Sequence, residues 1–244
     1  MQHPLISVVV PAYNEEKTLP ACLDSLLDQD CSFPYEIIVV DNASTDRTAE
    51  IARQYSARLL HEPVKGVARA RHTGFAAARA DLIASTDADC VAPSDWLTQI
   101  RRVFTNQPEL IAVGGYTLFY DAPYGLNFFP RLTHHLNAMR LVGGVVGQQP
   151  LSTQNMAVRK TAYQQVGGFN PAITSPLGLD DVDLTLRLSA LGPVAVLPNP
   201  VIWASARRYR QAPVRTIGYR WANYASYALL RRGVFRRASA DIRL

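Results

Sequence analysis

Cysteine and lysine are scarce in this sequence. The three cysteines form no C-x-x-C pair and no cysteine–histidine spacing, so the common zinc motifs and a disulfide framework are excluded. A sparse, odd set of thiols is typical of a reducing compartment. No apolar run approaches the ~18 residues of a membrane span, and no basic region followed by an apolar region marks a signal peptide at the N-terminus. We therefore expect a cytoplasmic protein.

Two frequent nucleotide-binding motifs are also missing. The pattern G-x-x-x-x-G-K-[ST] does not occur, and neither does G-x-G-x-x-G. These absences exclude the P-loop and the dinucleotide-binding fingerprint. Any nucleotide site in this chain must therefore be built from other residues.

Positive charge is concentrated at one end of the chain. The 244 residues carry a net charge of +5, with 25 lysines and arginines against 20 acidic residues. Residues 204–244 hold ten arginines and one acidic residue, so this segment has a net charge of +9 and residues 1–203 have a net charge of −4. Such a segment suits an anionic partner, either an anionic membrane surface or a nucleic acid.

Strands and helices are predicted to alternate in the first part of the chain. Short β-branched runs predict strands buried on both faces, and apolar residues at helical spacing predict helices between them. The strands are expected at 5–10, 36–40, 57–61 and 82–86, and the helices at 15–29, 47–56 and 67–80. Ser44 or Thr45 offers an N-cap for the second helix. This alternation predicts an α/β fold with a mostly parallel, doubly wound sheet and helices on both faces.

The second part of the chain is expected to extend the same sheet. Strands are predicted at 111–118, 152–158 and 194–198, and helices at 96–106, near 131–142, at 159–166 and at 181–191. The stretch 119–150 is rich in glycine, proline and aromatic residues and should be mostly loops. Residues 213–237 are an arginine- and tyrosine-rich helical candidate. We therefore expect one domain at 1–203, with halves of about 1–95 and 96–203, and a basic helical tail at 204–244.

Polar residues follow four of the predicted strands. They are Tyr13-Asn14, Asp41-Asn42, Lys65-Gly66 and Asp87-Ala88-Asp89. Ligands of doubly wound sheets bind at the carboxyl ends of the strands, so these residues should converge. Asp41 can accept hydrogen bonds from a nucleobase or ribose, or it can simply build a turn. Lys65, Gly66, Arg69 and Arg71 can bind phosphate, or the arginines can form a solvated helix face.

Two groups of acidic residues are candidates for catalysis. Asp87 and Asp89 follow a buried strand and can hold Mg²⁺ or Mn²⁺, which would neutralise a diphosphate; two solvated loop carboxylates are the alternative. Asp180, Asp181 and Asp183 open a helix, where acidic residues also stabilise the helix dipole. Because adjacent carboxylates resist simultaneous ionisation, one of them can have a raised pKa and act as a general base.

Seven motifs stand in a fixed order along the chain. They are P-A-Y-N-E-E (11–16), V-V-D-N-A-S-T-D (39–46), G-x-x-x-A-R-x-x-G (66–74), D-A-D (87–89), N-M-A-V-R-K (155–160), G-G-F (167–169) and D-D-V-D-L-T-L-R-L (180–188). Together, over roughly residues 5–203, they resemble the family 2 glycosyltransferases, which share the GT-A fold. The resemblance implies an inverting enzyme that moves a sugar from a nucleotide-diphosphate donor to an acceptor hydroxyl. Residues 1–203 would then be a GT-A catalytic domain, with its nucleotide-sugar half before its acceptor half.

The resemblance, taken with the phosphate donors above, assigns roles to single residues. The expected contacts of the nucleotide sugar are Pro11, Ala12, Tyr13, Glu15, Asp41, Lys65, Gly66, Arg71, Asp87 and Ala88. Asp89, together with Asp87, would hold the divalent cation, Mg²⁺ or Mn²⁺. Asp181 would be the base that deprotonates the acceptor, with Asp180 beside it. Asn155 and Asp180 are the expected contacts of the acceptor.

The chain departs from the family pattern at several positions. His72 stands where the A-R-N-x-G motif has asparagine, and Asp180 stands where a glutamate usually precedes the base. Residues 217–221 (I-G-Y-R-W) lack the glutamine of the Q-x-x-R-W signature of processive synthases, so we expect transfer of a single sugar. No histidine follows the last strand, and Arg207 and Arg208 are candidates to bind the diphosphate instead.

Two other functions remain open alternatives. A nucleotidyltransferase that makes nucleotide sugars would use a similar sheet, but P-A-Y-N-E-E replaces its usual glycine-rich loop. A nucleic-acid-binding protein would use the basic tail, but no recognised binding motif is present. We favour transfer to a carbohydrate or lipid-linked acceptor, for a cell-envelope glycan precursor. Residues 204–244 would then dock the enzyme peripherally on the inner face of the membrane.

Overall fold

The computed structural model describes residues 3–122, 127, 151–173, 179–212, 214 and 218, without the side chains of residues 179, 198 and 208. The helix expected near 131–142 lies outside the described residues, and so does most of the tail. The predicted division of the chain at residues 95 and 203 therefore stays a prediction. None of the helices in the described ranges is long and apolar enough to cross a membrane.

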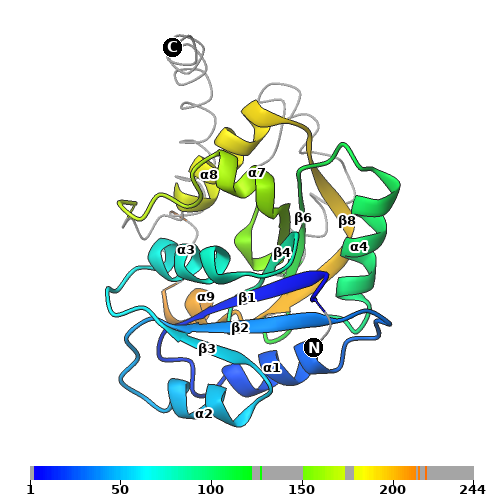
Figure 1. Ribbon diagram of the computed structural model, residues 1–244. Helices are drawn as coiled ribbons and strands as arrows, with labels where there is room; N and C mark the ends of the chain where they lie inside the picture. Colours follow the sequence, from blue (N-terminus) through cyan, green and yellow to red (C-terminus); the bar gives the residue numbers. More distant parts are fainter. Residues whose placement is uncertain are drawn as a thin grey trace.

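One mixed sheet forms the centre of the described structure (Figure 1). Its strands lie in the order β3-β2-β1-β4-β7-β6-β8-β5. The strands are β1 (Ile6–Ala12), β2 (Tyr35–Asp41), β3 (Arg58–His61), β4 (Leu82–Ser85), β5 (Cys90–Val91), β6 (Ala112–Phe119), β7 (Met156–Arg159) and β8 (Val194–Ala204). The pairs β1·β2, β1·β4, β2·β3 and β6·β8 are parallel. The pairs β4·β7, β5·β8 and β6·β7 are antiparallel. The predicted mostly parallel α/β fold is confirmed.

Helices cover both faces of this sheet (Figure 1). They are α1 (Leu19–Leu27), α2 (Thr48–Gln54), α3 (Val67–Ala77), α4 (Trp96–Asn106), α7 (Lys160–Gln165), α8 (Leu179–Leu191) and α9 (Arg207–Gln211), with a 3₁₀ turn η1 (Thr153–Asn155) before β7. Residues of α1, α2 and α4 join one core cluster, and residues of α3, α7 and α8 join the other. The sheet therefore lies between two helical layers, as a doubly wound fold requires.

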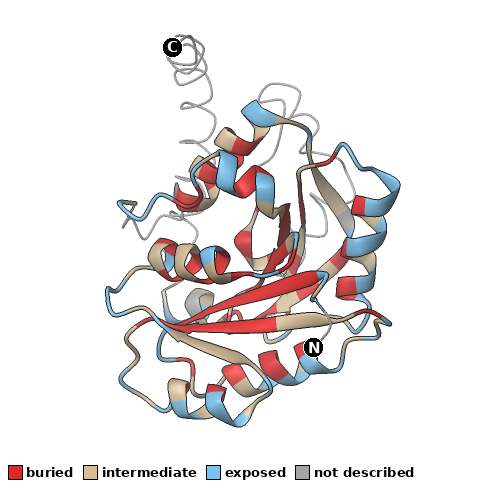
Figure 2. Ribbon diagram, in the orientation of Figure 1, coloured by how far each residue is buried: buried red, intermediate tan, exposed pale blue. Residues whose placement is uncertain are grey.

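The central strands are buried on both faces because their side chains alternate between the two cores. Val8 and Val10 of β1 pack with α1, whereas Val9 packs with α3. Figure 2 shows β1 and β2 as largely buried, and every residue of β1 is in fact buried. A strand that is covered by helices on both faces of the sheet needs apolar side chains at every position. Its sequence is therefore a continuous apolar run, which is the signal that predicted β1.

Tertiary contacts changed three predicted boundaries. Helix α1 begins at Leu19 rather than near residue 15, because the N–H of Glu15 donates to Thr48 Oγ1 at 2.8 Å and holds this segment in a loop. The N-cap of α2 is Arg47, so the prediction of Ser44 or Thr45 was wrong. Ser44 and Thr45 instead bond the loop after β1. The strand predicted at 152–158 begins only at Met156, and Thr153–Asn155 form a 3₁₀ turn before it.

Candidate active site

The carboxyl ends of the parallel strands meet at one edge of the sheet. Ala12 lies beside Asp41 in the register of β1 with β2, and Asp41 lies beside His61 in that of β2 with β3. On the other side of β1, Val9 lies beside Ser85 of β4. The loops that follow these strands therefore leave the sheet next to one another. The convergence expected from the four motifs is present in the structure.

The end of β2 presents a carboxylate next to an exposed aromatic ring. Asp41 is only 5% exposed; its Oδ1 accepts the N–H of Ser44 at 3.3 Å, and its Oδ2 lies 3.1 Å from Nδ1 of His61. Tyr13, directly after β1, is exposed, and the Lys65 ammonium lies 4.6 Å from its ring centre and donates to its hydroxyl at 2.7 Å. A ring face near an acceptor carboxylate suits a nucleobase.

The loop before α3 is held by a single amide side chain. Nδ2 of Asn42 donates to the carbonyls of Glu62 and Val64 at 3.1 and 2.8 Å, and its Oδ1 accepts the N–H of Gly66 at 2.8 Å. Gly66 has a φ of 151°, which only glycine adopts without strain. Asn42 thereby fixes the loop that carries Lys65 against the end of β2.

Three of the residues that are expected to contact the nucleotide sugar have buried side chains. Pro11 and Ala12 are buried in β1, and Ala88 is buried between the two carboxylates of the D-x-D motif. Ala12 and Ala88 belong to the core cluster on the α1 side of the sheet. Any contact of these alanines with a donor would therefore use their backbone.

An acidic region lies at the ends of β1 and β4. Glu15 and Asp89 are buried, and Arg207 of α9 lies between them, with its Nη2 2.6 Å from Glu15 Oε1 and 4.0 Å from Asp89 Oδ2. Burial raises the pKa of the nearby Cys22 thiol strongly, and the charges of Asp89 and Asp87 raise it further. The local potential is therefore negative, and Arg207 is drawn into it. Arg208, the other candidate, has no described side chain.

Arg71 connects the D-x-D motif, Asp87–Asp89, to the acidic residues at the start of α8. Its side chain, on α3, is 6% exposed; Nη2 donates to Asp87 Oδ1 at 3.0 Å, and Nη1 donates to Asp180 Oδ2 at 2.6 Å. Nη1 also lies 3.4 Å from Asp181 Oδ1. Burial alone would lower the pKa of the Arg71 guanidinium, but the carboxylates of Asp180, Asp87 and Asp181 hold it well above its usual range. The guanidinium therefore stays charged and joins two acidic motifs that lie far apart in sequence.

Asp181 has the properties of a base that works near neutral pH. Burial raises the pKa of its carboxyl to about 7, and the charge of Asp180 acts in the same direction, while Arg71 and Thr153 oppose the rise. Its side chain is still 23% exposed. Thr153 of η1 donates to it twice, from Oγ1 to Oδ1 at 2.9 Å and from its N–H to Oδ2 at 3.3 Å. A carboxylate with this pKa and an open side can take a proton from a bound hydroxyl.

Asp180 and Asn155 are placed differently from what acceptor contacts would need. The Asp180 side chain is 1% exposed and its Oδ2 is used by Arg71. The Asn155 amide is 3% exposed; its Nδ2 donates to the carbonyls of Tyr116 and Pro200, and its Oδ1 accepts the indole N–H of Trp96. Both side chains hold parts of the protein together, and their predicted contacts with the acceptor stay a prediction.

Sequence reasoning missed Thr153 and His61 at this site. His61 ends β3, so the rule that located the other strand-end residues could have found it. Thr153 lies in a turn whose contact with α8 depends on the whole fold, and no local pattern signals it. His72, which replaces the asparagine of the family pattern, lies next to α7, with its Nδ1 3.3 Å from the Tyr163 hydroxyl. The Tyr163 hydroxyl also accepts the N–H of Phe169 at 3.1 Å.

Known proteins share both the sequence pattern and the architecture. Residues 7–165 match the family model described as Glycosyl transferase family 2. Glycosyltransferase AglE of Haloferax volcanii is 30% identical over 208 residues, which are 82% of this chain and 66% of AglE. Dolichyl-phosphate beta-glucosyltransferase of Mus musculus is 41% identical over 76 residues, which are 28% of this chain and 24% of that enzyme.

A solved structure is similar to this chain in fold. The mannosyltransferase PcManGT from Pyrobaculum calidifontis, in complex with GDP-Man and Mn²⁺, is similar with a TM-score of 0.63 and 25% sequence identity, covering 86% of this chain and 61% of that chain. The fold and the acidic edge of the sheet thus define an α/β protein of the GT-A type. The chain belongs to glycosyl transferase family 2. It spans less than two thirds of the length of AglE and of the mouse enzyme.

Proposed function

We propose that this chain transfers one sugar from a nucleotide-diphosphate donor to an acceptor hydroxyl, with inversion at the anomeric carbon and with the help of a divalent cation. The family assignment supports sugar transfer over the nucleotidyltransferase and nucleic-acid alternatives. The observation that carries the mechanism is the Asp181 carboxylate, whose pKa of about 7 suits a base and which Arg71 links to Asp87 on the donor side.

The proposed donor site and the proposed acceptor site lie on opposite sides of Arg71. On the donor side, Asp41 and Tyr13 offer a hydrogen-bond acceptor and a ring face to the nucleoside. On the acceptor side, Asp181 removes the hydroxyl proton as the new oxygen–carbon bond forms. The bond from the anomeric carbon to the diphosphate breaks in the same displacement, and the diphosphate leaves with the electron pair. Attack from the face opposite the leaving group produces inversion.

The acidic residues fit a divalent cation that is shared with the donor. In the residues that the structure describes, no group of three or more acidic, cysteine or histidine side chains is arranged to hold a metal ion by itself. Asp87 and Asp89 are hard oxygen ligands, and their negative charges add to the rise that burial causes in the pKa of the nearby Cys22 thiol. Mg²⁺ commonly binds through one or two carboxylates together with substrate phosphates and water. A cation held by Asp89 and Asp87 would neutralise the charge that develops on the leaving diphosphate.

The acceptor and the location of the enzyme are further parts of the proposal. AglE and the mouse enzyme carry names of glycosyltransferases, and the mouse enzyme is named for dolichyl phosphate. We propose a carbohydrate or lipid-linked acceptor, contacts to it from residues 96–203, and a cytoplasmic enzyme whose basic tail docks at the inner face of a membrane. The missing glutamine in residues 217–221 supports transfer of a single sugar.

The test separates donor binding from chemistry. Thermal shift against UDP-, GDP- and dTDP-sugars, with Mn²⁺ or with EDTA, identifies the donor, because a ligand present at about 100 times its Kd raises the unfolding temperature by several degrees. Asp181→Asn should keep the full shift and lose transfer by about a hundredfold or more, since a general base contributes about that much. Loss of donor binding in this variant would contradict the role of Asp181 as the base.

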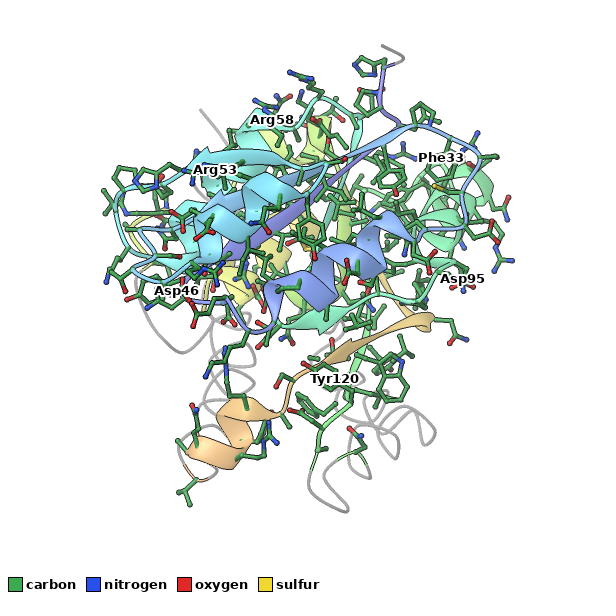
Figure 3. The ribbon with its side chains drawn as sticks, turned by 90° about the horizontal axis from the view of Figure 1, so that it is seen from below. Phe33, Asp46, Arg53, Arg58, Asp95 and Tyr120 are labelled. Atoms are coloured by element: carbon green, nitrogen blue, oxygen red, sulfur yellow. The ribbon has the colours of Figure 1, made fainter. Side chains whose placement is uncertain are left out.

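The cation is tested in the same assay. Asp89→Ala should lose the part of the shift that depends on Mn²⁺ and keep the part seen in EDTA. Asp95→Ala is the control, because Asp95 is an exposed carboxylate at the start of α4 whose side chain accepts from Gln99 (Asp95 is labelled in Figure 3). An unchanged Mn²⁺ dependence in Asp89→Ala would overturn the metal assignment.

A further inference from the structure

The carboxylate of Asp181 is held from outside its own helix by Thr153. Thr153 is fully buried in the η1 turn, and both its hydroxyl and its backbone N–H donate to Asp181. The segment just before this turn is also fastened to α8, one helical turn further on. There, Thr185 Oγ1 donates to the Asp181 carbonyl at 2.7 Å and accepts the N–H of Leu151 at 2.9 Å. The position of Thr153 relative to Asp181 is therefore fixed on both sides.

The two oxygens of the Asp181 carboxylate are not equivalent. Oδ1 accepts the Thr153 hydroxyl at 2.9 Å and lies 3.4 Å from Arg71 Nη1. Oδ2 accepts the N–H of Thr153 at 3.3 Å. A carboxylate oxygen has two lone-pair directions, so the contacts from described residues occupy Oδ1 fully and Oδ2 half. The lone pair that no described residue contacts is on Oδ2, and we assign the incoming proton to it.

We propose that Thr153 is a positioning residue for the transfer reaction: it fixes the rotamer of Asp181, favours its ionised form and leaves Oδ2 to take the acceptor proton. This inference rests on the proposed role of Asp181 as the base. In the displacement, the acceptor O–H bond breaks and its proton moves to Oδ2 as the acceptor oxygen bonds to the anomeric carbon. The Thr153 hydroxyl keeps Oδ1 occupied, so the proton is not taken up on the side of Arg71.

Other charged groups also face Asp181 and must be kept constant in the test. Among the described residues they are Asp180 on the same helix, Arg71 on α3 and Asp87 after β4. Asp180 and Asp87 favour the protonated carboxyl, and Arg71 favours the carboxylate. Thr153 is uncharged, so replacing it changes a hydrogen bond and leaves this set of charges as it is. A shift that follows its replacement can therefore be assigned to the hydrogen bond.

The test compares Thr153→Val with Thr153→Ser and with a matched control. Valine has nearly the shape of threonine and lacks the hydroxyl, so Thr153→Val should raise the midpoint of the acidic limb of the pH–rate profile by about one unit, the size expected for a lost hydrogen bond to a charged group. It should also lower kcat and leave the donor KM unchanged. Thr153→Ser should restore both. Thr185→Val removes the hydroxyl that holds Leu151 and leaves both Thr153 donors in place, so it should lower the unfolding temperature and shift the midpoint by clearly less than Thr153→Val does.

A second readout does not depend on activity. In protein labelled with ¹³C at the aspartate carboxyls, the Asp181 signal, assigned by its loss in Asp181→Asn, should titrate about one unit higher in Thr153→Val than in the wild type. Equal midpoints in the two proteins would overturn the proposal, and so would an equal change in Thr185→Val. Transfer activity that survives in Asp181→Asn would instead refute the base assignment, while the ¹³C titration would still report whether Thr153 favours the carboxylate.

Discussion

The residue that organises the site is Arg71, because one buried guanidinium faces three carboxylates. Asp87, Asp180 and Asp181 all lie within 3.4 Å of its terminal nitrogens. Three negative charges and one positive charge do not balance in a buried cluster, and isolated charge is expensive there. Part of the imbalance is relieved when Asp181 binds a proton, which is why burial and Asp180 raise its pKa to about 7. The catalytic property of Asp181 and the electrostatic cost of the cluster thus have the same origin.

This cost predicts a stability that depends on pH. The pKa of Asp181 is above its unfolded value of 3.8, so its contribution to stability is fully present below pH 3.8 and is lost as pH rises toward about 7. Asp181→Asn has no carboxylate to ionise. Its free energy of unfolding should therefore rise relative to that of the wild type between pH 5 and pH 8, by about 1 to 3 kcal/mol. Urea unfolding at the two pH values measures the difference.

A variant on the same helix provides the comparison for this prediction. Asp183 forms an ion pair with Arg187 one turn along α8. Asp183→Asn also removes one carboxylate from this helix. Its free energy of unfolding relative to the wild type should therefore change little between pH 5 and pH 8. A rise as large as that of Asp181→Asn would show a general effect of lost negative charge and would refute the linkage to Asp181.

At the scale of elements, α3 is the helix that carries Arg71, and its distance from the sheet is set by a glycine. A Cβ on Gly74 would lie 2.3 Å from Val9 Cγ1 of β1 and 2.9 Å from Val40 Cγ2 of β2. Side chains in the core cannot yield by that much at no cost. The close contact between α3 and the two central strands therefore depends on Gly74, and this contact brings Arg71 down to the carboxyl edge of the sheet.

Gly74→Ala should be destabilising although alanine favours helices. Alanine gains about 1 kcal/mol of helix propensity, but overpacking typically costs about 1 to 3 kcal/mol, and the predicted approach of 2.3 Å is severe. We expect a net loss of about 1 to 2 kcal/mol in urea unfolding. In the double variant with Val9→Ala the closer of the two clashes is removed, so its loss should be smaller than the sum of the two single losses. A simple sum would show that Gly74 does not set this distance.

The sequence predicted elements well where a single pattern determines them. Helix α4 has the predicted bounds Trp96–Asn106, and β1, β2 and β4 lie within two residues of the expected ranges. The predicted bounds were less accurate where residues distant in sequence compete for the same backbone groups. Ser44 Oγ accepts the N–H of Asn14 at 3.1 Å, so Ser44 was not available to cap α2.

In the candidate site, too, local patterns could be predicted and contacts between distant residues could not. Residues at strand ends, such as Asp41 and Asp87, could be located because a rule about parallel sheets places them. Contacts between motifs could not. Neither the bridge by Arg71 nor the ion pair of Glu15 with Arg207, which joins residues 192 positions apart, leaves a trace in local sequence. Tyr120 (labelled in Figure 3) is a similar case, since its N–H donates to the carbonyl of Ala204 and places it beside the end of β8.

At the scale of the whole molecule, charge is divided between two parts with different proposed partners. Residues 1–203 have a net charge of −4, and part of that acidity is the set of carboxylates around Arg71. Residues 204–244 have a net charge of +9. The acidic part would be repelled by an anionic bilayer, so attraction has to come from the basic tail. A basic residue near an anionic membrane surface contributes about 1 kcal/mol at physiological salt, so several of them together give measurable binding.

The full-length protein should therefore bind vesicles that contain anionic lipid and should not bind vesicles of phosphatidylcholine alone. Replacing Arg231, Arg232, Arg236 and Arg237 with glutamine removes four of the ten tail arginines and leaves the described catalytic residues intact. Binding to vesicles with 30% phosphatidylserine, measured by sedimentation, should fall by about tenfold or more, and raising the salt concentration should weaken the wild type in the same way. The donor-induced thermal shift should be equal in both proteins, because the donor site lies in the acidic part. Equal vesicle binding by the variant and the wild type would refute a membrane role for the tail and would leave an acceptor or a protein partner as its target.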